Sequence, residues 1–172
     1  VPPSEGSSVF KSADPDEQWQ GLRFERADAQ VISGLTVEGA LVGITVVSSP
    51  DVHIEDSKFS NNGTGVSLVS NDGVRSRVNR VERSVFEAND VGITASRTGL
   101  KAQGNRFSGA SGISLSGGTC GGGSRCGYRA EITDNLFDVR DTGLSAFGFV
   151  LEVTGNDFVN VDYAMDITML RP

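Results

Sequence analysis

The chain has 172 residues, enough to bury the core of one domain, and we treat residues 1–172 as a single domain. Its formal net charge of −7 argues against nucleic-acid binding and against docking on an anionic membrane, since both need a basic surface. No apolar run approaches the roughly 20 residues of a spanning helix, so we expect no membrane insertion. The chain begins with Val1 rather than Met, which favours a processed protein or an excised part of a longer one.

Taken in chain order, six segments share one pattern. Most have apolar residues at their first and third positions, Asn or Ser at the sixth and Phe at the eighth. Alternation in steps of two is typical of β-strands, so the first and third side chains should point inward, followed by a turn and an inward Phe. The segments are residues 30–37, 52–59, 79–86, 100–107, 130–137 and 151–158.

A second short strand follows each segment after five or six residues and opens with a small residue. Phe59, Phe86, Phe107, Phe137 and Phe158 are separated by 27, 21, 30 and 21 residues, a basic period of about 21 to 22 with two longer spacers. A period of this size with strand-like alternation predicts a solenoid of about six to seven coils, in which like side chains stack. The second strands are residues 43–46, 65–68, 92–95, 112–115, 143–146 and 164–167.

Residues 43–59 resemble a coil of the pectin-lyase-like superfamily of right-handed parallel β-helices, and residues 19–24 resemble the Trp-containing coil of secreted bacterial β-helix proteins. The resemblance covers about residues 8 to 168. It implies an all-β, right-handed parallel β-helix. Strands equivalent to residues 43–46 would form a first sheet, strands equivalent to residues 52–55 a second, and the short strands that contain Phe a third. Residues 69–78 and 116–129 are then inserted loops on one side. Because this scaffold carries lyases, hydrolases, epimerases, adhesins and spacers, the resemblance does not select a function.

Two cysteines, Cys120 and Cys126, lie in one glycine-rich segment. A zinc site needs more Cys or His ligands, and the only histidine is the distant His53. We therefore expect a local disulfide and an oxidising location: secreted, periplasmic or cell-surface. Asn62 begins an Asn-Gly-Thr glycosylation pattern, which is common by chance and leaves its glycosylation open.

The first sheet offers few catalytic groups. In enzymes of the superfamily that the chain resembles, the substrate lies along this sheet. Here the outward residues of the sheet carry hydroxyl groups, except for one carboxylate at the last position. The ligand residues of the family's lyases therefore have no counterpart in this sequence. Ser and Thr also suit any solvent-facing strand. We expect ligand contacts from Thr94 and Ser114 and from a basic wall of loop residues, which suits a polysaccharide or acidic glycan. The outward residues are Thr45, Ser67, Thr94, Ser114, Ser145 and Asp166, and the loop residues are Arg75, Arg77, Arg125, Tyr128 and Arg129.

The second sheet carries more charge outward. His53, Arg80 and Lys101 should lie in a row beside Glu55 and Glu82, because coils stack about 4.8 Å apart. This row could supply a catalytic base with cations beside it that neutralise charge. Alternatively, it is an ordinary solvent-exposed surface with ion pairs. The acids of residues 51–56 fall short of the ligand count for Ca²⁺. We therefore expect no metal and no cofactor.

These observations favour a non-enzymatic extracellular or cell-surface module that acts as a scaffold or a carbohydrate-binding surface. The alternative is a polysaccharide-active lyase, hydrolase or epimerase that uses His53, Arg80 and Lys101. A third interpretation is an accessory protein of the periplasmic copper-handling type, which shares the repeat, although the sequence shows no convincing ligand cluster for it. Unpaired strand edges at both ends predict flanking domains of the same chain or end-to-end association.

Overall fold

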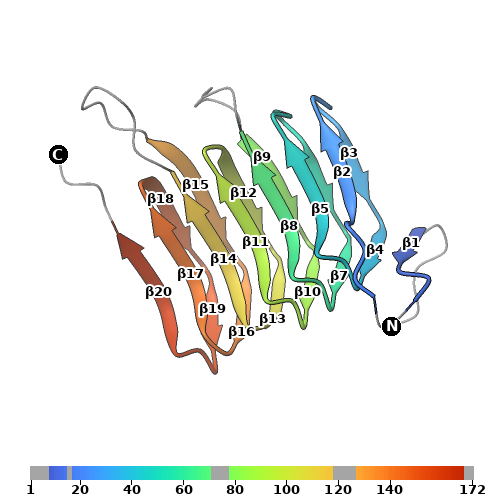
Figure 1. Cartoon of the computed structure of the whole chain (residues 1–172). Helices are drawn as coiled ribbons and strands as arrows, with labels where there is room; N and C mark the ends of the chain where they lie inside the picture. Colours follow the sequence, from blue (N-terminus) through green and yellow to red (C-terminus); the bar gives the residue numbers. More distant parts are fainter. Residues whose placement is uncertain (1–7, 15–16, 71–77, 118–126, 169–172) are drawn as a thin grey trace.

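The computed structural model describes residues 8–14, 17–70, 78–117 and 127–168, which form twenty parallel β-strands in three sheets (Figure 1). The first sheet contains β2 (Leu22–Glu25), β5 (Val42–Val47), β8 (Thr64–Val69), β11 (Val91–Ser96), β14 (Ser111–Ser116), β17 (Thr142–Phe147) and β20 (Tyr163–Thr168). The second contains β3 (Val31–Ser33), β6 (His53–Glu55), β9 (Val78–Glu82), β12 (Gly99–Gln103), β15 (Tyr128–Thr133) and β18 (Phe149–Thr154). The third contains β1 (Ser8–Lys11), β4 (Leu35–Glu38), β7 (Lys58–Ser60), β10 (Val85–Glu87), β13 (Arg106–Gly109), β16 (Leu136–Val139) and β19 (Asp157–Val159).

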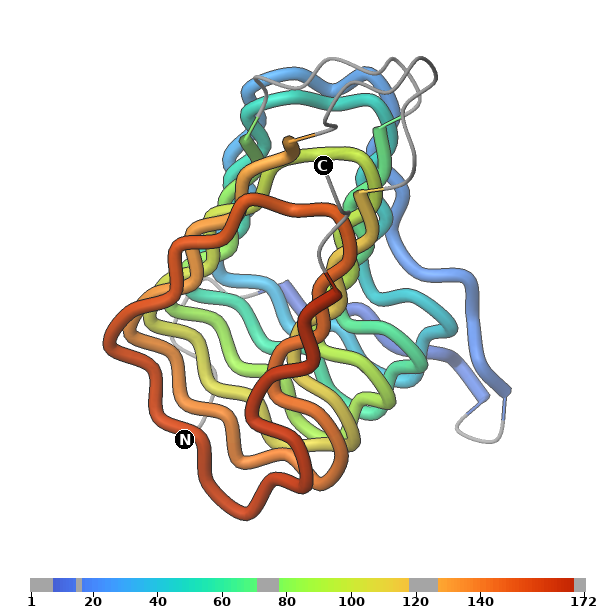
Figure 2. The backbone as a smooth tube through the Cα atoms, turned by 90° about the vertical axis from the view of Figure 1, so that its left-hand side faces the viewer, coloured from blue at the N-terminus to red at the C-terminus, as the bar shows by residue number. Residues whose placement is uncertain are grey.

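The strands follow one another from sheet to sheet, so the chain winds as three-sided coils that nest behind one another (Figure 2). Each strand pairs in parallel with the equivalent strand of the next coil. The prediction of an all-β, right-handed parallel β-helix is thereby confirmed. The strand bounds leave residues 70–77 and 117–127 between strands, close to the two predicted loops, of which residues 71–77 and 118–126 lie outside the described residues.

The aromatic column predicted from the repeat forms the centre of the core. Phe86 and Phe107 stack with ring centroids 4.8 Å apart and planes inclined by 12°, and Phe107 and Phe137 stack at 4.8 Å and 4°. These rings are at most 1% exposed. Burying each ring removes a large apolar area from water, about 1.5–3 kcal/mol relative to an exposed side chain. Each coil therefore needs its neighbours to bury its ring.

Glycines of the first sheet lie against these rings. A Cβ placed on Gly92 meets Phe107 Cδ1 at 2.5 Å and the carbonyl oxygen of Gly112 at 2.8 Å. Gly65 and Gly143 show equivalent contacts with the rings of Phe86 and Phe158. Glycine in β8, β11 and β17 is thus required by the close approach of the ring, since none of these three residues has a positive φ.

Polar side chains stack inside the coil as well. The Asn105 amide accepts from the Ser84 backbone N–H at 2.9 Å and donates to the Val81 carbonyl at 2.8 Å, while Asn135 repeats this pattern one coil later. Every buried side-chain nitrogen and oxygen of the described residues has a partner. These bonds satisfy backbone groups at the corners, where the strand ladders stop.

A second amide ladder, not predicted from the sequence, contains Asn62 and Asn89. The Asn62 side chain accepts from the Ala40 N–H at 2.9 Å and donates to Val37 O and to Asn89 Oδ1, and it is 2% exposed. A buried, fully bonded amide has no room for a glycan. The glycosylation pattern at Asn62 is therefore a structural element of the coil.

Candidate functional site

The second sheet brings His53, Glu55 and Glu82 together on its outer face. His53 and Glu55 are two residues apart in β6 and point to the same side, and Glu82 of β9 lies opposite Glu55 in the strand register. His53 Nε2 is 3.2 Å from Glu82 Oε2 and 3.4 Å from Glu55 Oε2. The three side chains are between 14% and 24% exposed, so the cluster is partly withdrawn from solvent.

Arg83 borders this cluster from the corner that follows β9. Its backbone φ of 49° and the φ of 48° at Asp56, one coil earlier, place both residues in the left-handed region at the same corner. The guanidinium of Arg83 contacts Glu55 and Glu82 and forms two 2.9 Å hydrogen bonds with the Asp56 carboxylate. These bonds lower the pKa of Asp56 and raise the pKa of Arg83. One cation thus contacts three carboxylates.

The three side chains His53, Glu55 and Glu82 carry groups that can bind a metal ion. His53 directs one imidazole nitrogen at the two glutamates, and the donor atoms of the three residues lie within 4.8 Å of one another. Two ligands at about 2.0–2.2 Å from one metal ion lie roughly 3 to 4 Å apart, so the spacings of 3.4 and 3.2 Å from His53 to the two glutamates suit ligands of a common ion. An imidazole with two carboxylates suits a divalent transition metal, including Cu(II), and lacks the soft sulfur that Cu(I) prefers. The residues present fit such an ion, provided that Arg83 moves aside.

The structure places the predicted row as expected and shows which members take part. Arg80 lies opposite His53, and Lys101 lies opposite Arg80. Neither cation forms an ion pair within the described part of the chain. Neither belongs to the cluster of His53, Glu55 and Glu82 that could hold a metal ion. The sequence placed Glu55 and Glu82 beside this row without assigning them a ligand role, and it indicated no role for Arg83.

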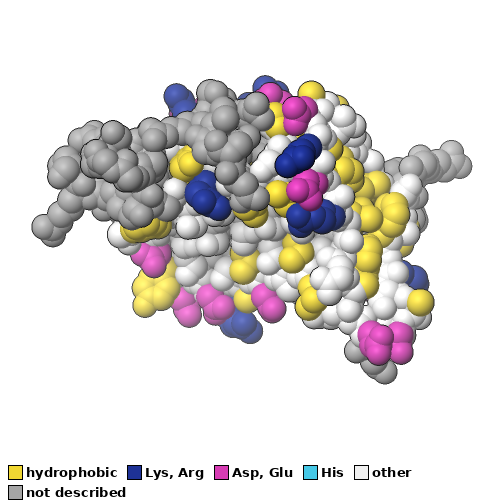
Figure 3. Space-filling view, turned by 45° about the horizontal axis from the view of Figure 1, so that its top comes forward, with side chains coloured by type: hydrophobic (Ala, Val, Ile, Leu, Met, Phe, Trp, Pro, Cys, Tyr) yellow, Lys and Arg dark blue, Asp and Glu magenta, His cyan; other side chains and the backbone are white. Residues whose placement is uncertain are grey.

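The outer face of the first sheet is free of charge over five successive strands. Thr94 and Ser114 lie opposite each other and belong to a half-buried column of hydroxyls. From β5 to β17 none of these strands contains a charged residue, and in the lower half of Figure 3 the sheet is white and yellow with charged groups along its rim. The predicted hydroxyl column is therefore present, as a neutral strip on an acidic protein.

The predicted basic wall is largely outside the structure. Arg75, Arg77 and Arg125 lie outside the described residues, as do both cysteines, whose disulfide stays a prediction. Tyr128 is 3% exposed and packs on Phe149, so its ring cannot stack on a sugar as expected. The Arg129 guanidinium contacts Glu131 at 3.2 Å and Glu152 at 2.8 Å. A surface ion pair of this kind leaves Arg129 less available to an acidic glycan.

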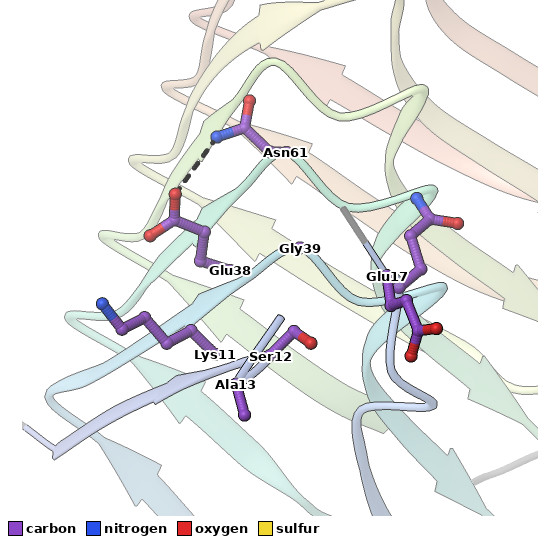
Figure 4. A pocket seen from close by; sticks show the side chains of 8 residues that line it. Lys11, Ser12, Ala13, Glu17, Glu38, Gly39 and Asn61 are labelled. Carbon is purple, nitrogen blue, oxygen red and sulfur yellow. Dashed lines mark hydrogen bonds between the residues drawn. The ribbon is translucent and has the colours of Figure 1, made fainter. Parts of the chain in front are cut away.

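A recess of about 530 Å³ at the N-terminal end was not predicted. It lies between the segment that follows β1 and the corner between the third and first sheets, with Glu38 and Asn61 joined by a 3.4 Å hydrogen bond on one side and Glu17 on the other (Figure 4). Its lining carries charges of both signs and no aromatic ring, so it selects no ligand class. The lining residues are Lys11, Ser12, Ala13, Glu17, Gln18, Glu38, Gly39 and Asn61.

The family follows from comparison with known proteins. A protein-family model described as "periplasmic copper-binding protein (NosD)" matches residues 4–168, nearly the whole chain. The chain belongs to this family. No curated protein and no solved structure is significantly similar to it.

Membership of the NosD family confirms the predicted location outside the cytoplasm, since the family is periplasmic. It also corrects one expectation. We expected no cofactor because the sequence shows no dense ligand motif, but the family is described as copper-binding. Among the described residues no helix is long and apolar enough to cross a membrane.

Proposed function

We propose that this chain is a periplasmic NosD-family β-helix that binds Cu(II) through His53, Glu55 and Glu82. The observation that carries the proposal is the convergence of the imidazole nitrogen of His53 on one carboxylate oxygen from each glutamate, at 3.4 and 3.2 Å. Strand pairing supports this arrangement, since residues two apart on β6 and the opposite residue on β9 share one face. A bound Cu(II) would supply a Lewis-acidic centre at the surface, and the protein would retain or deliver the ion.

Arg83 stabilises the cluster of His53, Glu55 and Glu82 before an ion binds. Two carboxylates within reach of each other repel, and the guanidinium of Arg83 contacts both of them and offsets their charge. Asp56 offers Arg83 a further, bidentate partner. An incoming cation can therefore replace Arg83 at the glutamates while Arg83 keeps the bonds to Asp56.

Cu(II) titration of the purified chain tests the proposal, with electron paramagnetic resonance to report nitrogen coordination and calorimetry to report affinity. We expect one site per chain, an affinity loss of about tenfold or more in His53→Gln and in Glu82→Gln, and loss of the nitrogen signature in His53→Gln. Lys101→Ala is the matched control, because Lys101 lies on the same face outside the cluster. Equal affinity in all variants, or binding that persists in His53→Gln with unchanged spectra, would refute the site.

A second candidate function follows from the neutral strip on the first sheet. A row of hydroxyls without charge suits a neutral polysaccharide, which offers hydroxyls in return and needs no counter-ion. Binding to a glycan array, abolished by Thr94→Glu but kept in Lys101→Ala, would support this function. The enzymatic alternative predicts new unsaturated or reducing ends when the chain is incubated with pectate, alginate or glycosaminoglycans.

A further inference from the structure

The cluster of His53, Glu55 and Glu82 offers a metal ion one ring nitrogen and two carboxylate oxygens. Within the described part of the chain the one sulfur-containing side chain is Met165 of β20, which belongs to the first sheet and not to this face. Imidazole nitrogen and carboxylate oxygen are ligands of Cu(II), whereas thiolate and thioether sulfur select Cu(I). The donor atoms of the cluster therefore distinguish the two oxidation states of copper.

The charge of the cluster favours the oxidised ion as well. Glu55 and Glu82 lie directly opposite each other on neighbouring strands, and their side chains are 21% and 14% exposed, so water screens the two negative charges only in part. A dication neutralises both charges, and a monocation neutralises one. Coulomb attraction is stronger at a partly buried site than in water, so an ion that loses one charge is bound more weakly there.

Arg83 supplies the cation that the empty cluster needs. Its guanidinium contacts Glu55, lies 3.4 Å from Glu82 and forms two 2.9 Å hydrogen bonds with the Asp56 carboxylate. The Arg83 side chain is 52% exposed, so it can leave the glutamates without disturbing the packed core. The bonds to Asp56 keep it beside the cluster, from where it can return when an ion leaves.

Arg83 and copper thus compete for the same two carboxylates. Cu(II) carries twice the charge of the guanidinium and gains the imidazole of His53 as a third ligand. Cu(I) carries only the charge of the guanidinium, and the sulfur ligand that it prefers is not part of the cluster. Because Asp56 holds Arg83 in place, this competitor acts at a high effective concentration. We therefore expect Cu(II) to displace Arg83 from the glutamates, and Arg83 to displace Cu(I).

We propose that this site selects copper by oxidation state, so that it holds Cu(II) and releases the metal after one-electron reduction. The inference rests on the proposed function, because it concerns the same three ligands. In the release step an external electron donor gives one electron to Cu(II), which becomes Cu(I), and the bonds between the metal and its three ligands break. The guanidinium of Arg83 then returns to Glu55 and Glu82. No proton is transferred, and no covalent bond of the protein changes.

Copper affinities measured in both oxidation states test the proposal on the purified chain. Calorimetry gives the Cu(II) affinity, and anaerobic titration in ascorbate against a chromogenic Cu(I) chelator gives the Cu(I) affinity. We expect Cu(I) to bind at least about a hundredfold more weakly, which lowers the reduction potential of the bound copper by about 120 mV relative to the free ions, at 59 mV for each tenfold. Zn(II) has the charge of Cu(II) and is not reduced, so it should stay bound when ascorbate is added.

A soft donor placed in the cluster should reverse the selectivity. Glu82→Met replaces a carboxylate by a thioether, so we expect Cu(I) to bind about tenfold or more tightly than in the wild type and to stay bound in ascorbate. Glu82→Gln is the matched control, because it removes the same charge without adding sulfur. Lys101→Met places a thioether on the same face outside the cluster and should release copper as the wild type does. Circular dichroism should show the same β-fold in all variants.

The outcomes separate this inference from the proposed function. A wild type that binds no Cu(II) would refute both. A wild type that binds Cu(II) and Cu(I) with equal affinity would leave the proposed function standing and overturn this inference alone. The double variant Cys120→Ser, Cys126→Ser should show the same difference between the two ions as the wild type, because the cluster contains neither cysteine. A difference that disappears in this variant would also overturn the inference.

Discussion

The interior and the outer face of the second sheet are built by opposite rules. Inside, the same side chain recurs from coil to coil, as in the stack of Phe59, Phe86 and Phe107, because each ring packs on the one before it. Outside, β6 carries His53 where β9 carries Arg80, and no packing demand links them. The recurring positions therefore determine the fold, and the positions that change between coils are where function can reside.

Removing a ring from the middle of the interior tests this difference most severely. Phe107→Ala leaves a cavity between two stacked rings, and we expect a loss of about 3–5 kcal/mol in the free energy of unfolding. Urea denaturation followed by far-ultraviolet circular dichroism measures it. Phe158→Ala should cost clearly less, because Phe158 stacks on one ring only among the described residues and is partly exposed. Equal losses at the two positions would show that stacking does not govern the core.

The amide ladder should give the next largest effect. Asn105→Ala leaves the buried N–H of Ser84 and the carbonyl of Val81 without these partners, at about 1–3 kcal/mol for each unsatisfied group. Asn105→Ser is the matched variant, since Ser57 and Ser84 occupy the same ladder and accept the equivalent bond. We expect the serine variant to lose less stability in the same denaturation experiment. The reverse order would contradict the role assigned to the ladder.

A change at the outer face should affect metal binding and leave the fold in place. Arg83→Gln removes the cation that competes at Glu55 and Glu82, so we expect Cu(II) to bind several-fold more tightly while the thermal midpoint changes little. Calorimetric titration and a melting curve give the two values. Lys101→Gln, which removes a cation of the same face outside the cluster, is the control. Weaker Cu(II) binding in Arg83→Gln would mean that Arg83 supports the site.

The smallest expected effect is the dependence of stability on pH at the same corner. Hydrogen bonds from Arg83 hold the pKa of Asp56 below its usual value of 3.8. A carboxyl with a pKa lowered by folding stabilises the fold above its unfolded pKa, and this contribution is lost as the pH falls through the folded value. The difference in urea midpoint between wild type and Arg83→Gln should therefore be present at neutral pH, begin to shrink near pH 4 and disappear only below the lowered pKa of Asp56 in the folded state. A constant difference would contradict the ion pair.

The interior of the fold can be predicted from the sequence because stacked coils carry the same type of side chain at equivalent positions. The Phe column, the amide column at Asn105 and Asn135, and the outward hydroxyls all follow from position within the repeat. Tyr128 was misjudged because it was assigned to a loop, whereas β15 begins at this residue and turns its ring inward. The role of Asn62 stays open from the sequence, since a local three-residue pattern does not show that the side chain spans two coils.

The candidate site could be predicted only in part. The register aligns His53 with Arg80 and Glu55 with Glu82, and these neighbours follow from the repeat in the sequence. The diagonal approach of His53 to Glu82 does not follow from the repeat, because it depends on side-chain conformations. Arg83 was missed because it lies at a corner, where the left-handed backbone directs its side chain across the preceding coil.

The constant step between coils fixes distances along the axis of the molecule. With strands about 4.8 Å apart, seven coils span roughly 29 Å from the first strand to the last. Outward side chains at one position of the repeat therefore recur about every 4.8 Å, as Thr94 and Ser114 do on the first sheet. This spacing is set by the backbone hydrogen bonds between coils, so a substitution on an outer face changes which chemical group stands at a given step and leaves the distance between steps unchanged.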